Sequence, residues 1–360
     1  MRNGKLKVLE ISSYPPPLAG WGMRVHILKK VMESQSHVCE VLNIGKGRFQ
    51  KGRDFIPVFG AFDYARKVFK HRRKGFLIHM HLNGDSPKGM MLSILALTIS
   101  LLTFRRPVVT FHAGPVQKYF PQSQAPGLML VFKYIFTVPR HIICNSNVEK
   151  KAIQGYGIPA RKIIPIQAFT RQYLEFSSVV LPEKIENFYQ RFPFIISCYL
   201  FYRPQYFIEE MMNALEGVIA KRKDVGILIM GPDRETEPIK KLINRHGLDK
   251  HILLTGNQQH DNFLTIIKNS HIYLRTHWKD GVCSSVLEAL SLGVPVVAAE
   301  NGTRPPSVIT YENENISDMR DKILSTIENY EDVKACIVKP DIPDTVVDEM
   351  AVLSDEVAVN

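Results

Sequence analysis

The chain has 360 residues, of which 45% are hydrophobic and 22% charged, so it is long enough for two globular domains with ordinary cores. Its five Cys are scattered and form no C-x-x-C pair, which excludes a disulfide framework and a zinc knuckle and favours a reducing cytoplasm. The net charge of +11 is uneven, with 27 Lys and Arg against 8 Asp and Glu in residues 1–180 and 19 against 27 in residues 181–360, so the first half favours anionic partners.

Short apolar runs alternate with longer amphipathic segments along the chain. The opening "MRNGKLKVLEISSYPPP" has no long apolar core and no small-residue cleavage site, so we expect a first strand and not a signal peptide. The first series of predicted strands is Lys7–Ile11, Val38–Asn43, Phe76–His81, Val108–Phe111, His141–Cys144 and Lys162–Pro165. The second series is Phe194–Leu200, Gly226–Met230, His251–Thr255, His271–Arg275 and Pro295–Ala298.

This alternation predicts parallel sheets with crossover helices, and two series predict two doubly wound α/β domains. We expect the boundary near residue 180, with an N-terminal domain of residues 1–180 and a C-terminal domain of residues 181–342. The tail "PDTVVDEMAVLSDEV" has apolar residues near helical spacing. It predicts a closing helix within residues 343–360 that packs back on the first domain.

Two features of the first half suggest contact with a membrane surface. The basic segment Arg66–Gly75 interleaves Val68 and Phe69 with cations, as an interfacial amphipathic helix does, and Gly45–Arg53 is a second basic cluster. The uncharged run Gly89–Phe104 is shorter than the ~20 residues that a spanning helix needs, so we expect a buried or membrane-facing helix. A basic surface that serves only solubility explains the same residues. No nucleic-acid recognition motif accompanies them, so nucleic acid is not an expected partner.

The stretch "HWKDGVCSSVLEALSLGVPVVAAENGTRPP", from His277 to Pro306, has two interpretations. In the first, Ser285-x-x-Glu288 is a capping box, Gly293 ends the helix in a left-handed conformation, and "VPVVAA" is a buried parallel strand. In the second, Asp280 and Gly281 precede a helix N-terminus that attracts phosphate, while the carboxylate accepts hydrogen bonds from sugar hydroxyls. Nucleotide sugars carry both kinds of group.

The stretch resembles the C-terminal signature of family 4 glycosyltransferases, which are retaining enzymes of the GT-B fold. Their motif is E-x-x-x-x-x-x-x-E followed by A-x-x-x-G-x-P-V-(V/I)-A. Here the matching residues are Asp280, Glu288, Ala289, Gly293, Pro295, Val296, Val297 and Ala298. "LEISSYPPPLAGWGMRVHILKKVMESQSHVCEVLN", "VVTFHAG" and "RHIICNSNVEKKAIQGYGIPARKIIPI" resemble other family segments, in order. The resemblance implies a GT-B fold, in which two doubly wound Rossmann-like domains face a central cleft.

The resemblance also implies a site for a nucleotide diphosphate sugar, held mainly by the second domain. Glu288 would take the ribose hydroxyls, and Asp280, where the family usually has Glu, would contact the donor sugar. Backbone N–H groups would approach the sugar and diphosphate from Gly281, Val282, Cys283 and Ser284. In the first domain, Gly20 and Gly22 match the loop that meets the diphosphate. Arg24 is either a phosphate contact or a solvated cation at the start of a helix.

His112 is the candidate catalytic histidine. It follows the strand in "VVTFHAG", where the family has a His against the donor sugar near the reaction centre. His79 and His81 alternate on a strand and share a face, so with His112 they could form a metal-ligand set. No carboxylate is evident in the sequence to complete that set, and the family needs no metal. We therefore expect no metal and no cofactor apart from the nucleotide sugar.

The chain departs from the family at the start of the second domain. The family usually has G-R-x-x-x-x-K-G there, with Arg and Lys on the diphosphate, whereas this chain has "SCYLFYRPQYFIEEMMNAL". The Gly is missing and Gln205 or Tyr206 stands at the Lys position. Arg203 is off register, yet it is the one plausible diphosphate cation of the segment. Arg304, in "NGTRPPSV", would either reach the leaving phosphate or be a loop cation.

Together these features predict a cytoplasmic, peripheral membrane glycosyltransferase of the hexosyltransferase type. It would move a sugar, with retention, to a glycan or lipid-linked acceptor in cell-envelope polysaccharide or glycolipid synthesis. Its catalytic residues would be His112, Asp280 and Arg203. Two alternatives stay open: a GT-B nucleotide-sugar epimerase, and a catalytically silent GT-B protein that binds nucleotide sugar without turnover.

Overall fold

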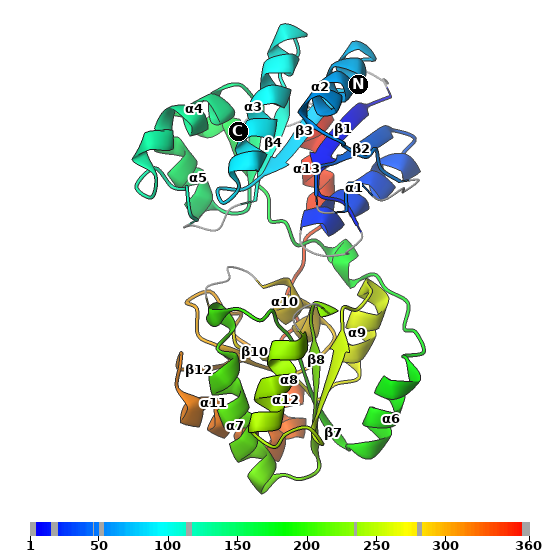
Figure 1. Ribbon diagram of the computed structural model, residues 1–360, viewed down its shortest axis with the longest axis vertical. Helices are drawn as coiled ribbons and strands as arrows, with labels where there is room; N and C mark the ends of the chain where they lie inside the picture. Colours follow the sequence, from blue (N-terminus) through cyan, green and yellow to red (C-terminus); the bar gives the residue numbers. More distant parts are fainter. Residues whose placement is uncertain are drawn as a thin grey trace. The chain divides into compact units, whose positions relative to one another are not determined.

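The structure is a computed structural model that describes residues 5–15, 21–45, 47–49, 54–112, 117–233, 236–278 and 283–354. The chain forms two compact units, which are described separately. The first comprises Met1–Gln172 together with Pro343–Asn360, and the second comprises Tyr173–Ile342. In Figure 1 the C-terminal helix, red, lies beside the blue N-terminal elements of the first unit.

The first unit is a parallel α/β unit built around one six-stranded sheet. Its strands follow the order β2-β1-β3-β4-β5-β6. These strands are β1 (Lys7–Ser12), β2 (Val38–Asn43), β3 (Leu77–Leu82), β4 (Val108–Phe111), β5 (His141–Cys144) and β6 (Ile163–Pro165). The helices are α1 (Trp21–Ser34), α2 (Ala61–Arg73), α3 (Pro87–Leu102), α4 (Met129–Thr137), α5 (Asn147–Gln154) and α13 (Thr345–Ser354), with 3-10 turns η1 (Pro126–Leu128), η2 (Ala160–Lys162) and η3 (Arg171–Leu174).

The two faces of this sheet differ in polarity because side chains alternate along each strand. One face is apolar and packs with residues of α2, α3 and α4 into the core of the unit; Ile78 and Met80 of β3 belong to it. On the same strand His79 and His81 point to the other face. That face is reached by side chains of α1 and α13.

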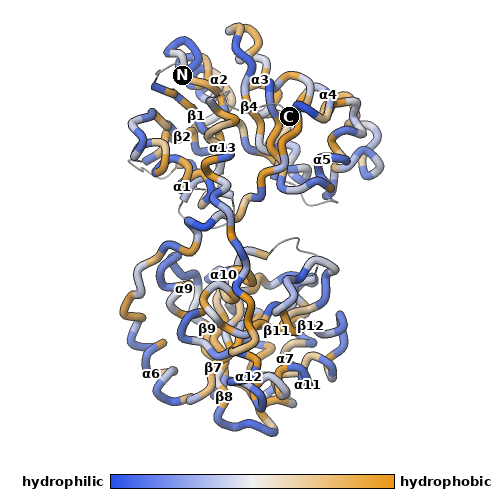
Figure 2. Tube along the Cα trace, turned by 180° about the vertical axis from the view of Figure 1, so that it is seen from behind, coloured by the Kyte–Doolittle hydropathy of each residue, from blue (hydrophilic) through white to orange (hydrophobic). Residues whose placement is uncertain are grey.

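The second unit is also a parallel α/β unit, and its sheet order is β12-β11-β10-β7-β8-β9. The strands are β7 (Phe194–Tyr199), β8 (Val225–Met230), β9 (Ile252–Gly256), β10 (Ile272–Arg275), β11 (Val296–Ala299) and β12 (Val308–Tyr311). The helices are α6 (Glu183–Arg191), η4 (Pro204–Tyr206), α7 (Ile208–Lys221), α8 (Thr236–Arg245), α9 (His260–Lys268), α10 (Ser284–Ser291), α11 (Ile316–Glu328) and α12 (Tyr330–Ala335). Figure 2 shows the hydrophobic colour concentrated along β7, β9 and β11 inside this unit.

The run Gly89–Phe104 forms most of α3, and only one side of that helix is buried. Ala96, Leu97 and Ile99 lie in the core, whereas Met91 and Leu102 are each 71% exposed. Among the described residues, no helix has the length and apolar character needed to cross a membrane.

Candidate functional site

The second unit has a topological switch point between β7 and β10. Its order, β9-β8-β7-β10-β11-β12, is that of the dinucleotide-binding α/β fold, in which ligands bind outside the carboxyl ends of the strands where the order reverses. The loop after β7 carries Arg203, and the loop after β10 leads into α10. Of the predicted residues of this unit that the structure describes, Arg203 follows β7, and Cys283, Ser284 and Glu288 lie at or within the helix that follows β10.

Glu288 lies in α10 and is a buried carboxyl, with 4% of the residue exposed. Burial raises its pKa to about 8, so the ligand-free side chain is mostly protonated at pH 7. Within the described part of the chain, no group forms a hydrogen bond with this carboxyl. A buried acid of this kind is suited to a ligand that supplies hydroxyl groups.

The capping-box interpretation of Ser285 and Glu288 is wrong. The N-cap of α10 is Cys283, without a side-chain capping bond, and Ser285 lies inside the helix. Tyr273 donates its phenolic O–H to Ser285 Oγ over 2.7 Å, which engages the hydroxyl that the box would need. The left-handed end at Gly293 is confirmed: its φ is 74°, and the N–H groups of Gly293 and Val294 close a Schellman motif.

Three arginines lie on the loops and strand ends around the switch point. Arg203 is exposed and its guanidinium lies 4.9 Å from the Phe201 ring centroid. Arg304 donates from Nε to Ala299 O over 3.0 Å and from Nη2 to His277 O over 2.8 Å, so it ties the loop after β11 to the loop after β10. Arg275, at the end of β10, is buried and donates to Tyr199 O of β7 over 3.2 Å.

At the start of α10, the structure describes only part of the predicted backbone cradle. Ser284 is the exposed first residue of the helix, and Cys283 Sγ lies 3.2 Å from Ser285 Oγ. Asp280, Gly281 and Val282 lie outside the described residues, as does Gly20 of the first unit.

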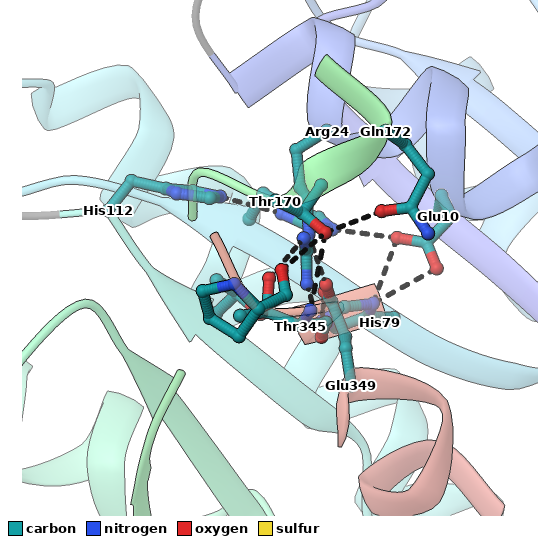
Figure 3. Close-up of polar contacts among 11 residues, drawn as sticks. Glu10, Arg24, His79, His112, Thr170, Gln172, Thr345 and Glu349 are labelled. Atoms are coloured by element: carbon teal, nitrogen blue, oxygen red, sulfur yellow. Dashed lines mark hydrogen bonds and ion pairs between the residues drawn. The ribbon is translucent and has the colours of Figure 1, made fainter. Parts of the chain in front are cut away.

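In the first unit a buried polar cluster crosses β1, β3 and β4, as Figure 3 shows. Glu10 lies opposite His79 in the strand register, and His81 lies opposite Thr110. His79 Nδ1 lies 3.0 Å from Glu10 Oε1, and His81 Nε2 lies 2.7 Å from Glu10 Oε2. His81 Nδ1 lies 2.8 Å from His112 Nε2, which makes His112 the outer end of the cluster.

The residues of this cluster differ in their protonation states. Burial alone would raise the pKa of Glu10, but the charge and hydrogen bonds of His79 and His81 hold it at about 2. Burial lowers the pKa of His79, but the charge of Glu10 outweighs this effect and the net pKa is raised. Burial and then His79 lower the pKa of His81. Burial and then His81 hold the pKa of His112 well below its usual range. Glu10 is thus an anion, whereas His81 and His112 are neutral.

The expectation that no carboxylate accompanies the histidines is wrong, because Glu10 lies between two of them. The ligand atoms of Glu10, His79 and His81 lie within 4.8 Å of one another, which is a spacing that could hold a metal ion. However, Glu10 accepts from both rings, and the second nitrogens of these rings contact Thr110 Oγ1 and His112. Both rings are 1% exposed or less, so the contacts form a closed hydrogen-bond network as they stand.

Arg24 differs from both interpretations of its sequence position. It is only 2% exposed, so it is not a solvated helix-start cation. Its Nε donates to Glu349 Oε2 over 2.6 Å, and its Nη atoms donate to Thr345 Oγ1 and O over 2.7 Å. A guanidinium buried in α13 contacts has no exposed surface for a phosphate, so the structure corrects the donor-binding role. Gly22, at the start of the same helix, lets α1 approach the chain after β1: a Cβ there would lie 3.3 Å from Ser13 O.

Sequence reasoning missed Glu10 and Arg275. Each is a charged residue within the apolar part of a strand, "VLEI" and "IYLR", and that mismatch was the available signal. A lone charge does not reveal its partner, and Glu10 is 69 and 71 residues from the histidines that it binds.

The sequence comparisons concern the second unit most strongly. Residues 193–339 match the family model described as glycosyl transferases group 1. An uncharacterized glycosyltransferase of Methanocaldococcus jannaschii is 25% identical over 213 residues, which are 58% of this chain and 51% of that protein. The chain thus spans about half the length of the curated relative that it matches.

Solved structures match nearly the whole chain in fold. A glycosyltransferase from Rickettsia africae has a TM-score of 0.68 at 16% identity, covering 97% of this chain and 98% of that chain. Anabaena HepE in complex with UDP-glucose has a TM-score of 0.65 at 14% identity (98% and 96%). The UDP-GlcNAc 2-epimerase from Neisseria meningitidis bound to UDP-GlcNAc has a TM-score of 0.63 at 16% identity (97% and 100%). These likenesses and the two six-stranded parallel sheets confirm the predicted GT-B fold class of two Rossmann-like α/β units, and most of the second unit is similar to the glycosyl transferases group 1 family.

Proposed function

We propose that this protein is a retaining glycosyltransferase that moves a hexosyl group from a nucleoside diphosphate sugar to an acceptor hydroxyl. The developing charge on the leaving diphosphate would be offset by Arg203, Arg304 and the N-terminus of α10, without a metal ion or further cofactor. Retention would rest on front-face attack with a phosphate oxygen as base. Asp280 would contact the donor sugar, and His112 would lie near the reaction centre.

The observation that carries this proposal is the position and chemistry of Glu288. A unit similar to the glycosyl transferases group 1 family has, on the helix that leaves its switch point, a buried carboxyl without a hydrogen bond to any described residue, and Arg203 and Arg304 lie on loops of the same unit. Ribose hydroxyls would supply the hydrogen bonds that this carboxyl lacks, and the cations would suit a diphosphate. HepE and the Neisseria epimerase bind UDP or UDP sugars, so UDP is the first nucleotide to test.

The direct test is calorimetric titration with UDP, GDP and ADP of the wild-type protein and of Glu288→Ala. We expect one diphosphate to bind the wild type and the variant to lose at least about tenfold in affinity, since a buried ligand hydrogen bond is removed. A matched control is Glu209→Ala, which changes an exposed carboxylate on α7 of the same unit. If no diphosphate binds, or if Glu288→Ala binds as the wild type does, the assigned donor site is incorrect.

Two other functions are separated by their products. An epimerase would convert the nucleoside diphosphate sugar without an acceptor, and the Neisseria fold neighbour makes this the second candidate. A silent binding protein would bind nucleotide and release nothing; the aromatic segment Phe201–Phe207, where the family has its diphosphate Lys, favours it. Chromatography of the donor after incubation with and without membrane glycolipid extract tells the three apart. Transfer that persists in EDTA would support the metal-independent mechanism.

We further propose that the acceptor lies at a membrane, and that the first unit docks there through the ends of α2 and α3. The two helix ends are joined, since Arg72 Nε donates to Thr103 Oγ1 over 2.9 Å and Arg105 donates to Gly75 O over 2.8 Å. We call this surface the α2–α3 tip; its exposed members are Phe69, Arg73, Lys74, Leu102, Phe104 and Arg105. Phe104 is 98% exposed, and its neighbours combine apolar and cationic groups, which suits an anionic inner leaflet.

Flotation with phosphatidylglycerol vesicles and with phosphatidylcholine vesicles tests the tip. We expect binding to the anionic vesicles at low salt, and its loss in a Leu102→Ser/Phe104→Ser variant and in an Arg73→Glu/Lys74→Glu variant. Val180→Ser is the control, because Val180 is a 92% exposed apolar residue of the second unit. Equal flotation of all variants, or none by the wild type, would remove the membrane proposal and leave a soluble glycan acceptor.

A further inference from the structure

Among Glu10, His79, His81 and His112, the residue that is partly exposed is His112. Glu10, His79 and His81 are 1% exposed or less, whereas His112 is partly exposed and its ring lies 4.7 Å from that of Trp21. The planes of the His112 and His81 rings are nearly parallel, at 13°, and His81 Nδ1 lies 2.8 Å from His112 Nε2. The line Glu10–His81–His112 therefore runs from a fully buried carboxylate to the imidazole of a partly exposed residue.

The position of each proton along this line follows from its partners. Glu10 is ionised and can only accept, so His81 Nε2 must carry the hydrogen of the 2.7 Å contact. A neutral His81 then has a bare Nδ1. The contact of 2.8 Å from this atom to His112 Nε2 requires one hydrogen between the two nitrogens, so His112 Nε2 donates it. A neutral His112 is left with a bare Nδ1, which has no hydrogen-bond partner among residues 5–15, 21–45, 47–49, 54–112, 117–233, 236–278 and 283–354.

We propose that Glu10 and His81 are positioning residues that fix His112 in its Nε2–H tautomer, so that Nδ1 accepts a hydrogen bond from a hydroxyl group of a ligand bound at the first unit. The inference rests on the proposed function for the identity of that hydroxyl. In this proposal the neutral His112 ring accepts a hydrogen bond from a neutral group. It does not act as a cation that binds the diphosphate. The lowered pKa of His112 agrees with this role.

The second branch of the cluster explains why a carboxylate is needed at position 10. Glu10 Oε1 accepts a hydrogen bond from His79 Nδ1. The other ring nitrogen, His79 Nε2, lies 2.7 Å from Thr110 Oγ1. A glutamine could satisfy the same two neighbours if its Oε1 accepted from His79 and its N–H donated to His81 Nε2. That donation would move the His81 proton to Nδ1 and the His112 proton to Nδ1 as well. Glu10→Gln thus keeps shape and hydrogen bonds but inverts the tautomer of His112.

The test combines ¹⁵N spectra of histidine-labelled protein with kinetics. In the wild type we expect the Nε2–H form at His81 and His112, assigned by comparison with His81→Gln and His112→Gln, and in Glu10→Gln the Nδ1–H form at both. UDP affinity in calorimetry should stay within about twofold in Glu10→Gln, since Glu10 belongs to the first unit. The kcat for release of UDP from UDP-glucose should fall about 10- to 100-fold, as expected for one lost, well-placed hydrogen bond.

Two further variants separate positioning from general damage to the cluster. Glu10→Asp retains the charge and should keep the Nε2–H tautomer and recover part of kcat. Glu349→Gln alters another buried carboxylate of the cluster that does not contact His81 or His112, and it should lower stability without changing the tautomer. A wild-type His112 in the Nδ1–H form, or unchanged spectra and kcat in Glu10→Gln, would overturn the inference. Absence of UDP, GDP and ADP binding in the wild type would instead overturn the proposed function, and the spectra would still decide the tautomer.

Discussion

Glu10 and Glu288 are both buried carboxyls, but they are held in opposite protonation states. Both are cut off from water, which by itself favours the neutral acid. The imidazoles of His79 and His81 lie within 3.0 Å of the Glu10 carboxylate. They stabilise its anionic form and lower its pKa to about 2. Glu288 has no comparable partner among the residues that the structure describes, and its pKa stands at about 8. The difference is one of neighbours, since both residues are no more than 4% exposed.

The first prediction concerns the effect of pH on Glu288. Because its folded pKa is raised above the unfolded value, ionisation destabilises the free protein progressively as pH rises from about 4.5 to 8, by roughly 2–4 kcal/mol at the upper end. Glu288→Gln removes this penalty. We expect the variant to be more stable than the wild type in urea unfolding at pH 8 and equal to it near pH 4.5, while it binds nucleotide less well.

The same group predicts proton release on nucleotide binding. If ribose hydroxyls donate to the carboxylate, the bound form favours the anion, so affinity should rise from pH 6 to pH 8 and the binding enthalpy at pH 7 should depend on the buffer. Glu288→Gln should show neither effect. A wild type whose affinity is flat with pH would mean that Glu288 is not a ligand contact.

At the scale of elements, the sequence predicts that a closing helix packs on the first domain but does not predict the contacts between α1 and α13. Arg24 and Glu349 are each about 2% exposed and form a buried ion pair, and Arg140 of the first unit donates to Leu353 O of α13 over 2.6 Å. Removing one partner of a buried pair leaves an uncompensated charge in the interior.

The second prediction is that Arg24→Met lowers the free energy of unfolding by about 3–5 kcal/mol. The double variant Arg24→Met/Glu349→Leu should recover much of this loss, because no buried charge is then left alone. Lys29→Met on the same helix is the control: Lys29 pairs with Glu33 at a partly exposed site, where less than about 1 kcal/mol is expected. Chemical unfolding measures the free energy of unfolding of all three variants. If the loss in the double variant equals the sum of the losses in the two single variants, Arg24 and Glu349 are not an energetically coupled pair.

The sequence predicted elements well where a single periodicity governs them. β2, β4 and β5 match their predicted bounds, and most other strands differ by one residue at an end. β12 was missed, because it has four residues, only its two ends are buried, and it follows two prolines at the sheet edge. The capping box failed because Tyr273, twelve residues earlier, takes the Ser285 hydroxyl. The role of Arg24 was predicted wrongly and Glu10 was overlooked for one reason: the residues that they contact are distant in sequence, and no local pattern encodes those contacts.

At the scale of the whole molecule, the chain leaves the first unit once and returns to it. Both connecting segments are attached within the first unit: Arg171 N donates to Pro343 O over 3.2 Å, and Thr345 N donates to Thr170 Oγ1 over 3.2 Å (Figure 3). The first unit is therefore made from two separate parts of the chain, whereas the second is continuous.

The third prediction follows from this connectivity. Residues 173–342 should fold alone, with a cooperative thermal transition. Residues 1–172 should not, because without α13 they lose the buried side chains of Val346, Val352 and Leu353 and leave Arg24 without Glu349. Joining residues 343–360 to residue 172 through a short glycine–serine linker should restore a cooperative transition in near-UV circular dichroism. A stably folded 1–172 fragment would show that α13 is dispensable.

The late position of α13 also sets an order of events during synthesis. After residue 172 has been made, the ribosome needs about 10–30 s to add the roughly 170 residues of the second unit before α13 exists. The second unit can thus complete its fold while the first still lacks a helix. Until α13 is made, the face of the first sheet that it will cover is exposed. That face carries Glu10, His79 and His81, which water solvates readily. The polar cluster therefore keeps an unfinished sheet from presenting a purely apolar surface to other nascent chains.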